Sequence, residues 1–247
     1  MGILNITPDS FYDGGKLTNT STTLDQARKM LSEGATFLDI GGYSSRPGAK
    51  DVSEEEELSR VLPAIQAIIS EFPNALLSVD TFRSKVAKEA VRAGAVMVND
   101  ISGGRLDEQM IPVVAELQVP YVLMHMRGTP QTMDTWTHYE DLVKEVVHYF
   151  SERLLRTREA GINDVILDPG FGFSKTLEQN FELLNTLELL EHLDAPLLVG
   201  LSRKSMIYRT LGITAKDALN GTTSLHTIAL QKGAHILRVH DVKPAME

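Results

Sequence analysis

Two alternating patterns of apolar residues run along the chain. Short apolar runs rich in β-branched side chains predict strands at 2–6, 36–40, 76–80, 96–100, 121–125, 165–168, 197–200 and 236–240. Longer segments with an apolar residue at about every third or fourth position predict helices at 23–33, 54–71, 84–93, 106–117, 139–160 and 178–192. A strand followed by a helix, repeated eight times along the sequence, is typical of parallel barrels. We therefore expect an α/β fold, a (β/α)8 TIM barrel.

Residues at several predicted helix ends support this interpretation. Ser53 stands before an acidic segment with Glu56 three residues after it, which predicts a helix N-cap. Gly34, Gly94 and Gly161 each follow a predicted helix and predict left-handed caps.

No linker rich in glycine, serine or proline interrupts the series, so we expect a single domain over residues 1–247. The chain opens directly on the first strand, and only 241–247 follow the eighth. We therefore expect a barrel without an N-terminal segment and without the last outer helix.

Composition narrows the classes of protein. The 247 residues are 43% hydrophobic and 23% charged, which is ordinary for a globular protein with a large core. No apolar run approaches the ~18 residues of a membrane span, and the start lacks an export signal. There is no cysteine, which excludes disulfides and thiolate metal sites, and we expect a cytoplasmic protein. A net charge of −9 opposes binding to nucleic acid.

Polar residues gather at the ends of the predicted strands. Carboxyl ends of parallel strands meet at one rim, where barrel enzymes build their sites, so these residues are expected to converge there. A strand-end Asp or Asn often only caps the next turn, and this alternative stays open for any one of them. The residues concerned are Asn5, Asp80, Asn99, Asp100, His125, Arg127, Asp168, Ser202, Arg203, Lys204, Arg238 and His240.

Three of these residues carry or can carry a positive charge, and their positions predict that each needs a partner. Arg238 and His240 alternate along a strand and so share one face, and a buried guanidinium without a counterion costs several kcal/mol by order of magnitude. A ligand phosphate would supply that counterion. Lys204 precedes a helix, where the helix dipole disfavours a cation, so we expect a compensating partner.

Trp136 and Phe171 are interpreted as packing residues.

Eight segments of the sequence together resemble the dihydropteroate synthase family. They are GILNITPDSFYDGG at 2–15, GGYSSRPGA at 41–49, SVDTFRSKVAKEA at 78–90, NDISGG at 99–104, MHMRGTPQTM at 124–133, ILDPGFGFSK at 166–175, GLSRKSMI at 200–207 and NGTTSLHTIALQKGAHILRVHDV at 220–242. The resemblance covers almost the whole chain in the order of the family. It implies a TIM barrel that joins 6-hydroxymethyl-7,8-dihydropterin pyrophosphate to 4-aminobenzoate, and in that family sulfonamides occupy the aminobenzoate site.

The resemblance also implies roles for individual residues. Asp168 would take a bidentate pair of hydrogen bonds from the pterin, Asp80 and Asn99 would bind its N8 and N1 side, and Lys204 would bind its carbonyl oxygen. The pyrophosphate would meet Asn5, Ser45, Arg238 and His240, with Asn5 offering an oxygen to Mg²⁺.

The implied reaction is a substitution in which pyrophosphate leaves before the amine attacks. Arg238, His240 and Mg²⁺ would stabilise the departing group. Asp13 would face the cationic intermediate and pair with Arg46. The aminobenzoate ring would lie between Phe173 and Pro47, with its carboxylate near Ser205.

Two departures from the family and two other functions stay open. Tyr43 and Ser45 stand where the family usually has Glu and Thr, and the role of Tyr43 is unassigned. A pterin-dependent methyltransferase barrel would share the ring-binding residues, but a methyl donor has no pyrophosphate for Lys204, Arg238 and His240 to bind. A non-catalytic pterin-binding module is the other alternative. We expect small-molecule substrates, no membrane contact and a homodimer.

Overall fold

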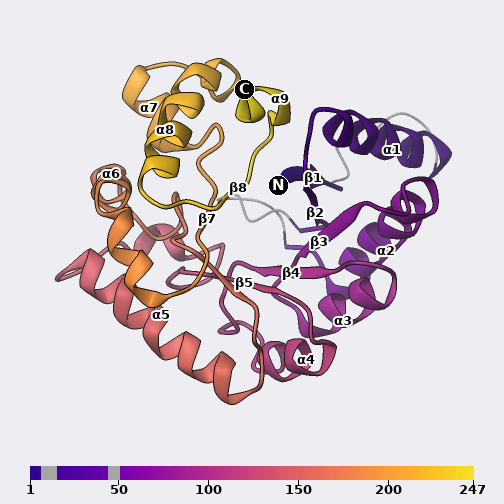
Figure 1. Ribbon diagram of the computed structural model, residues 1–247, viewed down its shortest axis with the longest axis horizontal. Helices are drawn as coiled ribbons and strands as arrows, with labels where there is room; N and C mark the ends of the chain where they lie inside the picture. The colour runs from indigo at the N-terminus through magenta and orange to yellow at the C-terminus, as the bar shows by residue number, and fades with distance from the viewer. Residues whose placement is uncertain (7–15, 44–50) are drawn as a thin grey trace.

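The computed structural model describes residues 1–6, 16–43 and 51–247, and its strands form a closed parallel barrel (Figure 1). The strands are β1 (Gly2–Asn5), β2 (Phe37–Gly41), β3 (Leu76–Asp80), β4 (Met97–Asp100), β5 (Tyr121–Met124), β6 (Val165–Asp168), β7 (Leu198–Val199) and β8 (Ile236–Leu237). The first six form one sheet in sequence order, and β7 pairs with β8. Single parallel bridges from Leu167 to Leu197 and from Gly2 to Val239 close the ring. The predicted eight-stranded barrel is confirmed.

The bounds of the first seven strands agree with the prediction to within one residue at each end, and β8 ends before its predicted limit. β3 and β6 have the predicted limits, whereas the ladders of β7 and β8 are shorter than predicted. The chain beyond β8 still bonds to its neighbours, because Arg238 N donates to Val199 O and Val239 N donates to Met1 O, both at 2.9 Å. Arg238 therefore keeps a strand-like position at the barrel wall.

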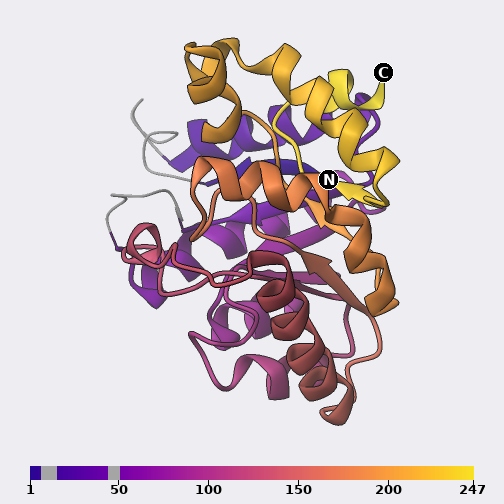
Figure 2. The ribbon, with the colours of Figure 1, turned by 90° about the vertical axis from the view of Figure 1, so that its left-hand side faces the viewer.

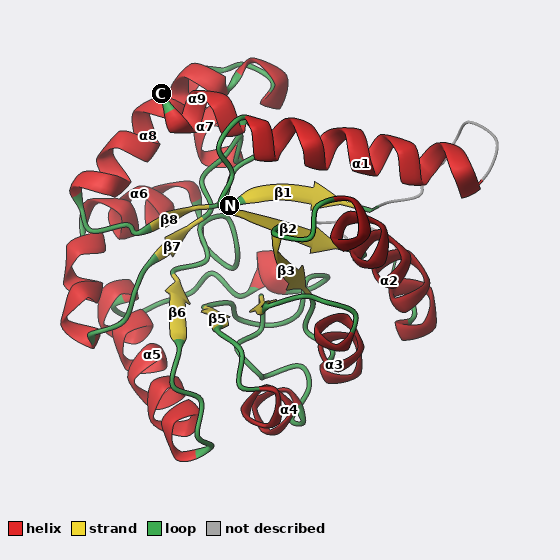
Figure 3. Cartoon of the chain, turned by 45° about the vertical axis from the view of Figure 1, so that its right-hand side comes forward, coloured by secondary structure: helices red, strands yellow, loops and turns green. Residues whose placement is uncertain are grey.

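Helices surround the strands on all sides (Figure 3). They are α1 (Lys16–Ser32), α2 (Glu54–Glu71), α3 (Ser84–Arg92), α4 (Met110–Leu117), α5 (Leu142–Glu159), α6 (Leu177–Asn185), α7 (Ser205–Leu211), α8 (Leu219–Gln231) and α9 (Val242–Met246), with 3₁₀ helices η2 (Met133–Thr135), η3 (Leu187–Leu193) and η4 (Ala215–Asp217). Ser53 caps α2 by accepting a hydrogen bond from Glu56 N at 3.2 Å, as predicted. Gly34, Gly94 and Gly161 have φ of 101°, 121° and 90°, which confirms the predicted left-handed caps.

Several helix predictions were wrong in their limits. The helix predicted at 178–192 is divided into α6 and η3, and Thr186 at the junction donates its hydroxyl back to Glu182 O at 2.9 Å. The helix predicted from 106 begins only at Met110, because the Asp107 carboxylate binds Gln109 N at 2.9 Å in a turn before it. A helix was predicted after Lys204 without defined limits, and this helix is α7, whereas α8 was not predicted.

Too few residues were expected after the eighth strand for the last outer helix, and the structure has one short helix of 5 residues there. The short helix α9 packs on α8, and buried Val242 anchors it (Figure 2). Figures 1 and 2 show the two termini near each other, and a Cβ at Gly2 would lie 3.2 Å from Val242.

The interior of the barrel has an apolar layer with a polar layer beyond it. Met97, Val122, Ile166 and Leu198 pack together inside the ring, with Phe37 and Ile236 against them. Because residues two positions apart on a strand share a face, the next inward residues are polar on four strands. They are Asp39, Asn99, Asp168 and Arg238. The alternation of the strands therefore brings these four side chains to the same level, toward the carboxyl ends.

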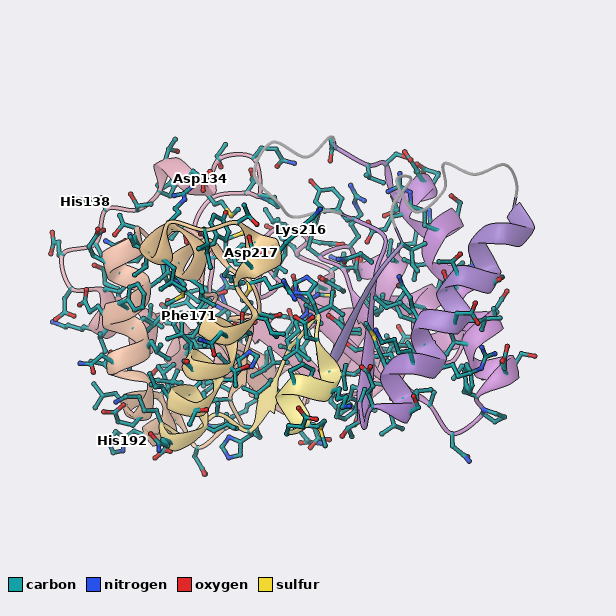
Figure 4. The ribbon with its side chains drawn as sticks, turned by 90° about the horizontal axis from the view of Figure 1, so that it is seen from above. Asp134, His138, Phe171, His192, Lys216 and Asp217 are labelled. Carbon is teal, nitrogen blue, oxygen red and sulfur yellow. The ribbon has the colours of Figure 1, made fainter. Side chains whose placement is uncertain are left out.

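Two further expectations about exposure have different outcomes. Phe171 is completely buried, as predicted for a packing residue, and it lies inside the molecule in Figure 4. Trp136, also interpreted as a packing residue, is 56% exposed and packs against the surface near Gly128. Across the described ranges 1–6, 16–43 and 51–247, no helix combines the length and the apolar character that crossing a membrane requires.

Candidate functional site at the barrel rim

Arg238 joins two carboxylates inside the barrel. Its Nε donates to Asp39 Oδ2 and its Nη2 donates to Asp80 Oδ2, both at 2.6 Å. Burial opposes the charge of Arg238, but the two carboxylates outweigh it and raise the pKa of the guanidinium. The sequence argument that Arg238 lacks a protein counterion was therefore wrong. Nη1 has no hydrogen-bond partner among the described residues, and the side chain is 20% exposed.

Asp80 lies at the end of β3 with a perturbed carboxyl group. Burial raises its pKa to about 7, the nearby Arg238 opposes this shift, and the negative charge of Asp39 adds to it. Two carboxylates that share one guanidinium repel each other. Near neutral pH this group is therefore able to carry or lose a proton.

Asp39 is a site residue that the sequence analysis missed. Its side chain is completely buried, and Oδ2 accepts hydrogen bonds from both Arg238 and Asn99 Nδ2, the latter at 2.9 Å. Oδ1 is buried without a partner among the described residues. The signal was present in the sequence, because a charged residue in the middle of the apolar run FLDIG must face a polar interior. The strand-end criterion did not include it.

Asp168 and Lys204 lie on neighbouring strand ends, on β6 and after β7. The buried carboxylate of Asp168 accepts a hydrogen bond from Gly170 N at 2.8 Å. Burial raises the pKa of Asp168, while Lys204 and Arg238 oppose the rise. Burial also lowers the pKa of Lys204 to about 8, against the attraction of Asp168. The opposite charges of Asp168 and Lys204 therefore each stabilise the ionised form of the other group.

Lys204 has the compensating partners that its place before α7 requires. Its Nζ donates to the carbonyl oxygen of Phe171 and lies 4.7 Å from the centre of the Phe173 ring. A Cβ at Gly172 would lie 3.2 Å from Lys204 Cδ, so the lysine runs closely over the loop after β6. Phe173 is half-buried, and Ser205 is the first residue of α7. Of the two predicted aminobenzoate residues, Phe173 therefore contacts Lys204 in space and Ser205 follows it directly in the chain.

Asn5 and His240 occupy the rim beside β8. Asn5 is exposed at the end of β1, and its Oδ1 would lie 3.4 Å from a Cβ at Gly41, a point that is 3.6 Å from Asp80 Oδ2. The amide and the carboxylate thus lie over the same glycine. His240 is exposed, and its Nδ1 lies 3.0 Å from Ser202 Oγ.

The predicted residues on the two loops cannot be placed. Asp13, Ser45, Arg46 and Pro47 lie outside the described residues. Within the described part of the chain, no group of three or more His, Asp or Glu side chains could hold a metal ion. Asn5 and Asp80 together are a small set of hard oxygen donors. Such a set fits Mg²⁺ that keeps its waters and takes its other ligands from substrate phosphates.

Tyr43 belongs to a cluster next to the site. Its ring meets Phe82 edge to face at 5.1 Å, and the Arg83 guanidinium lies over both rings at 5.4 and 5.0 Å. Its hydroxyl accepts a hydrogen bond from Gln131 Nε2 at 2.5 Å. These residues line an open cavity of about 340 Å³. The Tyr43 ring is thus stabilised at this position by packing on Phe82 and by the Arg83 guanidinium.

Four further histidines, which do not end a predicted strand, lie in structural surroundings. His138 and His192 lie at the edge of the molecule in Figure 4. His226 is buried, and burial lowers its pKa to about 4. His235 is exposed and accepts a hydrogen bond from Leu197 N at 3.2 Å. None of them belongs to the rim site.

Comparison with known proteins places this geometry in a family. A family model described as "Pterin binding enzyme" matches residues 1–240. The chain is 46% identical over its whole length to dihydropteroate synthase of Escherichia coli (strain K12), covering 88% of that protein. It superimposes with a TM-score of 0.92 and 43% identity on Xanthomonas albilineans dihydropteroate synthase with 4-aminobenzoic acid, covering 100% of this chain and 88% of the other. The same Xanthomonas enzyme in complex with 7,8-dihydropteroate gives a TM-score of 0.88 at 40% identity, with coverage of 100% and 88%.

Proposed function

Because the chain belongs to the dihydropteroate synthase family of pterin-binding enzymes, we propose that its barrel rim catalyses the reaction of that family. It joins 6-hydroxymethyl-7,8-dihydropterin pyrophosphate to 4-aminobenzoate and releases pyrophosphate and 7,8-dihydropteroate, a transferase step of folate synthesis. One observation carries the proposal. Acidic and amide side chains that suit a nitrogen-rich ring lie beside cations that suit a diphosphate, at one end of one barrel.

The pterin is held by the polar layer. The buried Asp168 carboxylate takes the hydrogen bonds of the 2-amino group and N3, and Lys204 donates to the ring carbonyl. Asp80 and Asn99 take the N8 and N1 side. Asn99 Nδ2 already donates to Asp39, which leaves its second amide hydrogen and its oxygen for the ligand.

The pyrophosphate is bound on the β1 and β8 side of the rim. Arg238 offers Nη1, His240 is exposed beside it, and Asn5 lies above Gly41. Ser45 contributes a hydroxyl from its loop. Asn5 provides an oxygen to Mg²⁺, which supplies positive charge to the phosphate oxygens when it is bound. Arg238 keeps its carboxylate partners throughout, so its orientation is set before substrate arrives.

The aminobenzoate lies on the other side of Lys204. Its ring stacks between Phe173 and Pro47, and its carboxylate approaches Ser205. Sulfonamides occupy the same place, as suggested by Yersinia pestis dihydropteroate synthase, which is 45% identical and was solved in a sulfonamide drug complex. The sulfonamide carries an aryl amine on a ring of the same size, so it makes the same stacking contact.

Bond breaking precedes bond making in the proposed reaction. The C–O bond at the pterin methylene breaks with its electron pair going to pyrophosphate, and Arg238 and His240 stabilise that negative charge. By the family resemblance alone, Asp13 and Arg46, which lie outside the described residues, are assigned to the cationic pterin that remains. The lone pair of the neutral aryl amine then forms the C–N bond, and the proton that the amine loses passes to the released pyrophosphate or to water. No covalent enzyme intermediate is required.

One assay tests the function against its alternatives. Purified protein with Mg²⁺ is expected to release pyrophosphate only when the pterin pyrophosphate and 4-aminobenzoate are both present, with dihydropteroate formed in equal amount. Pterin binding without pyrophosphate release would indicate a binding module. Methyl transfer from a reduced folate to a corrinoid, without pyrophosphate release, would indicate the methyltransferase barrel.

A homodimer in the cytoplasm completes the proposal. Leu211, Ile228 and Leu230 expose 55%, 38% and 50% of their surface on α7 and α8, which supports an apolar contact between two copies. A protein without cysteine suits a reducing compartment. Light scattering on purified protein measures the mass directly, and a monomer that binds no hydrophobic dye would contradict the dimer.

A further inference from the structure

Lys175 is a buried lysine that the proposed reaction does not use. Its Nζ lies 3.1 Å from the carbonyl oxygen of Gly170, 3.1 Å from that of Phe173 and 3.0 Å from Nδ1 of His125. These three partners match the three N–H donors of an ammonium group. All three are neutral, so no carboxylate bond explains why a charged side chain is buried here.

The loop 169–175 has backbone carbonyl groups that need hydrogen-bond donors from side chains. Gly170, Gly172 and Ser174 have φ of 70°, 77° and 46°, in the left-handed region. A Cβ at Gly170 would lie 2.1 Å from His125 O, so the loop passes directly over the end of β5. Buried carbonyl groups in such a turn cannot reach water and need protein donors. Lys204 supplies one for Phe171, and Lys175 supplies those for Gly170 and Phe173.

Burying the Lys175 cation has a clear cost. Burial lowers its pKa to about 7, the field of Asp168 opposes this shift, and the positive charges of Lys204 and Arg127 add to it. An apolar side chain of similar length would fill the space without that penalty. The Lys175 ammonium instead fixes the orientation of the Phe173 carbonyl through its hydrogen bond, and the orientation of the backbone there sets the direction of the Phe173 ring.

The two ends of the loop depend on Lys175 to different extents. Asp168 belongs to β6, where its carbonyl accepts from His125 N at 2.9 Å and its side chain accepts from Gly170 N. The strand ladder therefore holds Asp168 whether or not Lys175 is present. Phe173 lies outside the ladder and depends on its own carbonyl bond to Lys175 and on Phe173 N donating to Gly170 O at 3.1 Å.

We propose that Lys175 is a positioning residue of the aminobenzoate site, which holds the Phe173 ring where the aryl amine stacks against it. The inference rests on the proposed function, because aminobenzoate is the substrate assigned to Phe173. It predicts that losing the Lys175 donors impairs aminobenzoate binding and largely spares pterin binding.

A double-mutant cycle tests the proposal through Phe173. Lys175→Met, Phe173→Leu and the double variant are assayed for the KM of each substrate. Lys175→Met is expected to raise the KM for 4-aminobenzoate about tenfold and that for the pterin pyrophosphate less than about twofold. The double variant is expected to be no worse than the poorer single one, since both changes disturb one contact. Lys144→Met, an exposed lysine on α5, is the matched control and should leave both values unchanged.

Several results would overturn the proposal. Fully additive effects of the two substitutions would mean that Lys175 does not act through Phe173. An equal rise in both KM values, or a lower melting temperature with both KM values unchanged, would assign Lys175 a general structural role. If the Met variant does not fold, Lys175→Arg and Lys175→Gln give the same contrast, and equal aminobenzoate KM values in these two would contradict a role for the cation. Wild-type protein that forms no dihydropteroate would refute the proposed function itself, a result that involves no variant.

Discussion

Arg238 and Asp39 are 199 residues apart in the chain, and their side chains meet at 2.6 Å between Nε and Oδ2. The contact exists because the barrel closes, which brings β8 and β2 to the two sides of β1. Each inward side chain follows an apolar one two residues earlier, so the pair lies directly above the packed interior layer. This pair organises the site, since Asp39 also binds Asn99.

Replacing Asp39 tests the energy of this arrangement. Asp39→Asn keeps the shape but removes the charge that Arg238 faces, so we expect a loss of about 1–3 kcal/mol of unfolding free energy. Urea denaturation measures it. Asp25→Asn, which removes the carboxylate of the exposed Arg28 pair, should change the unfolding free energy far less, because solvent screens an exposed pair. A variant at position 39 that is as stable as the wild type would show that the buried pair adds no net stability.

Asp168 is expected to matter for pterin rather than for folding. Asp168→Asn places an amide donor against the donors of the pterin, so kcat/KM for the pterin pyrophosphate should fall about 10- to 100-fold. Pyrophosphate release at varied pterin concentration measures this. Asp164→Asn, an exposed position just before β6, is the control. Unchanged turnover in the Asp168 variant would remove this residue from the site.

The pKa of Lys204 predicts how pterin binding depends on pH. Because burial lowers the pKa to about 8, the side chain is an ammonium below that pH and loses its charge above it. If only the ammonium binds the ring carbonyl, pterin affinity should weaken about tenfold for each pH unit above 8. Calorimetric titrations of a pterin from pH 6 to 10 measure the trend.

Lys204→Met supplies the comparison for that trend. The ratio of wild-type to variant affinity cancels the titration of the pterin itself, and this ratio should decline with a midpoint near pH 8. A ratio that is constant over the whole range would mean that the charge of Lys204 does not contribute to binding.

Chelation tests the proposed role of magnesium. Treatment with EDTA should abolish most turnover, and added Mg²⁺ should restore it, because the metal would add to the positive charge that Arg238 and His240 offer the pyrophosphate. Asn5→Ala should raise the Mg²⁺ concentration that gives half-maximal rate by several-fold, whereas Asn185→Ala at the exposed end of α6 should not. Full activity after exhaustive chelation would exclude the metal.

The apolar patterns determined most of the fold in advance. The strands β3 and β6 and the helix α2 have their predicted limits, because strong β-branched runs and a capped amphipathic helix are local signals. The helix α8 was missed, and the helix predicted at 178–192 is broken at Thr186. Their limits depend on packing against the barrel and on side-chain bonds to the backbone, which periodicity does not register.

For the site, the sequence by itself determined which polar residues end the strands and therefore which rim carries them. Only the tertiary structure decided how those residues are paired. Asp39 became a partner of Arg238 and Asn99, and Lys175 became a partner of His125, because the closed ring brings residues far apart in the chain within hydrogen-bond distance. The strength of a hydrogen bond depends on distances of a few ångströms, and residue order along a chain does not specify such distances between strands that are far apart in it.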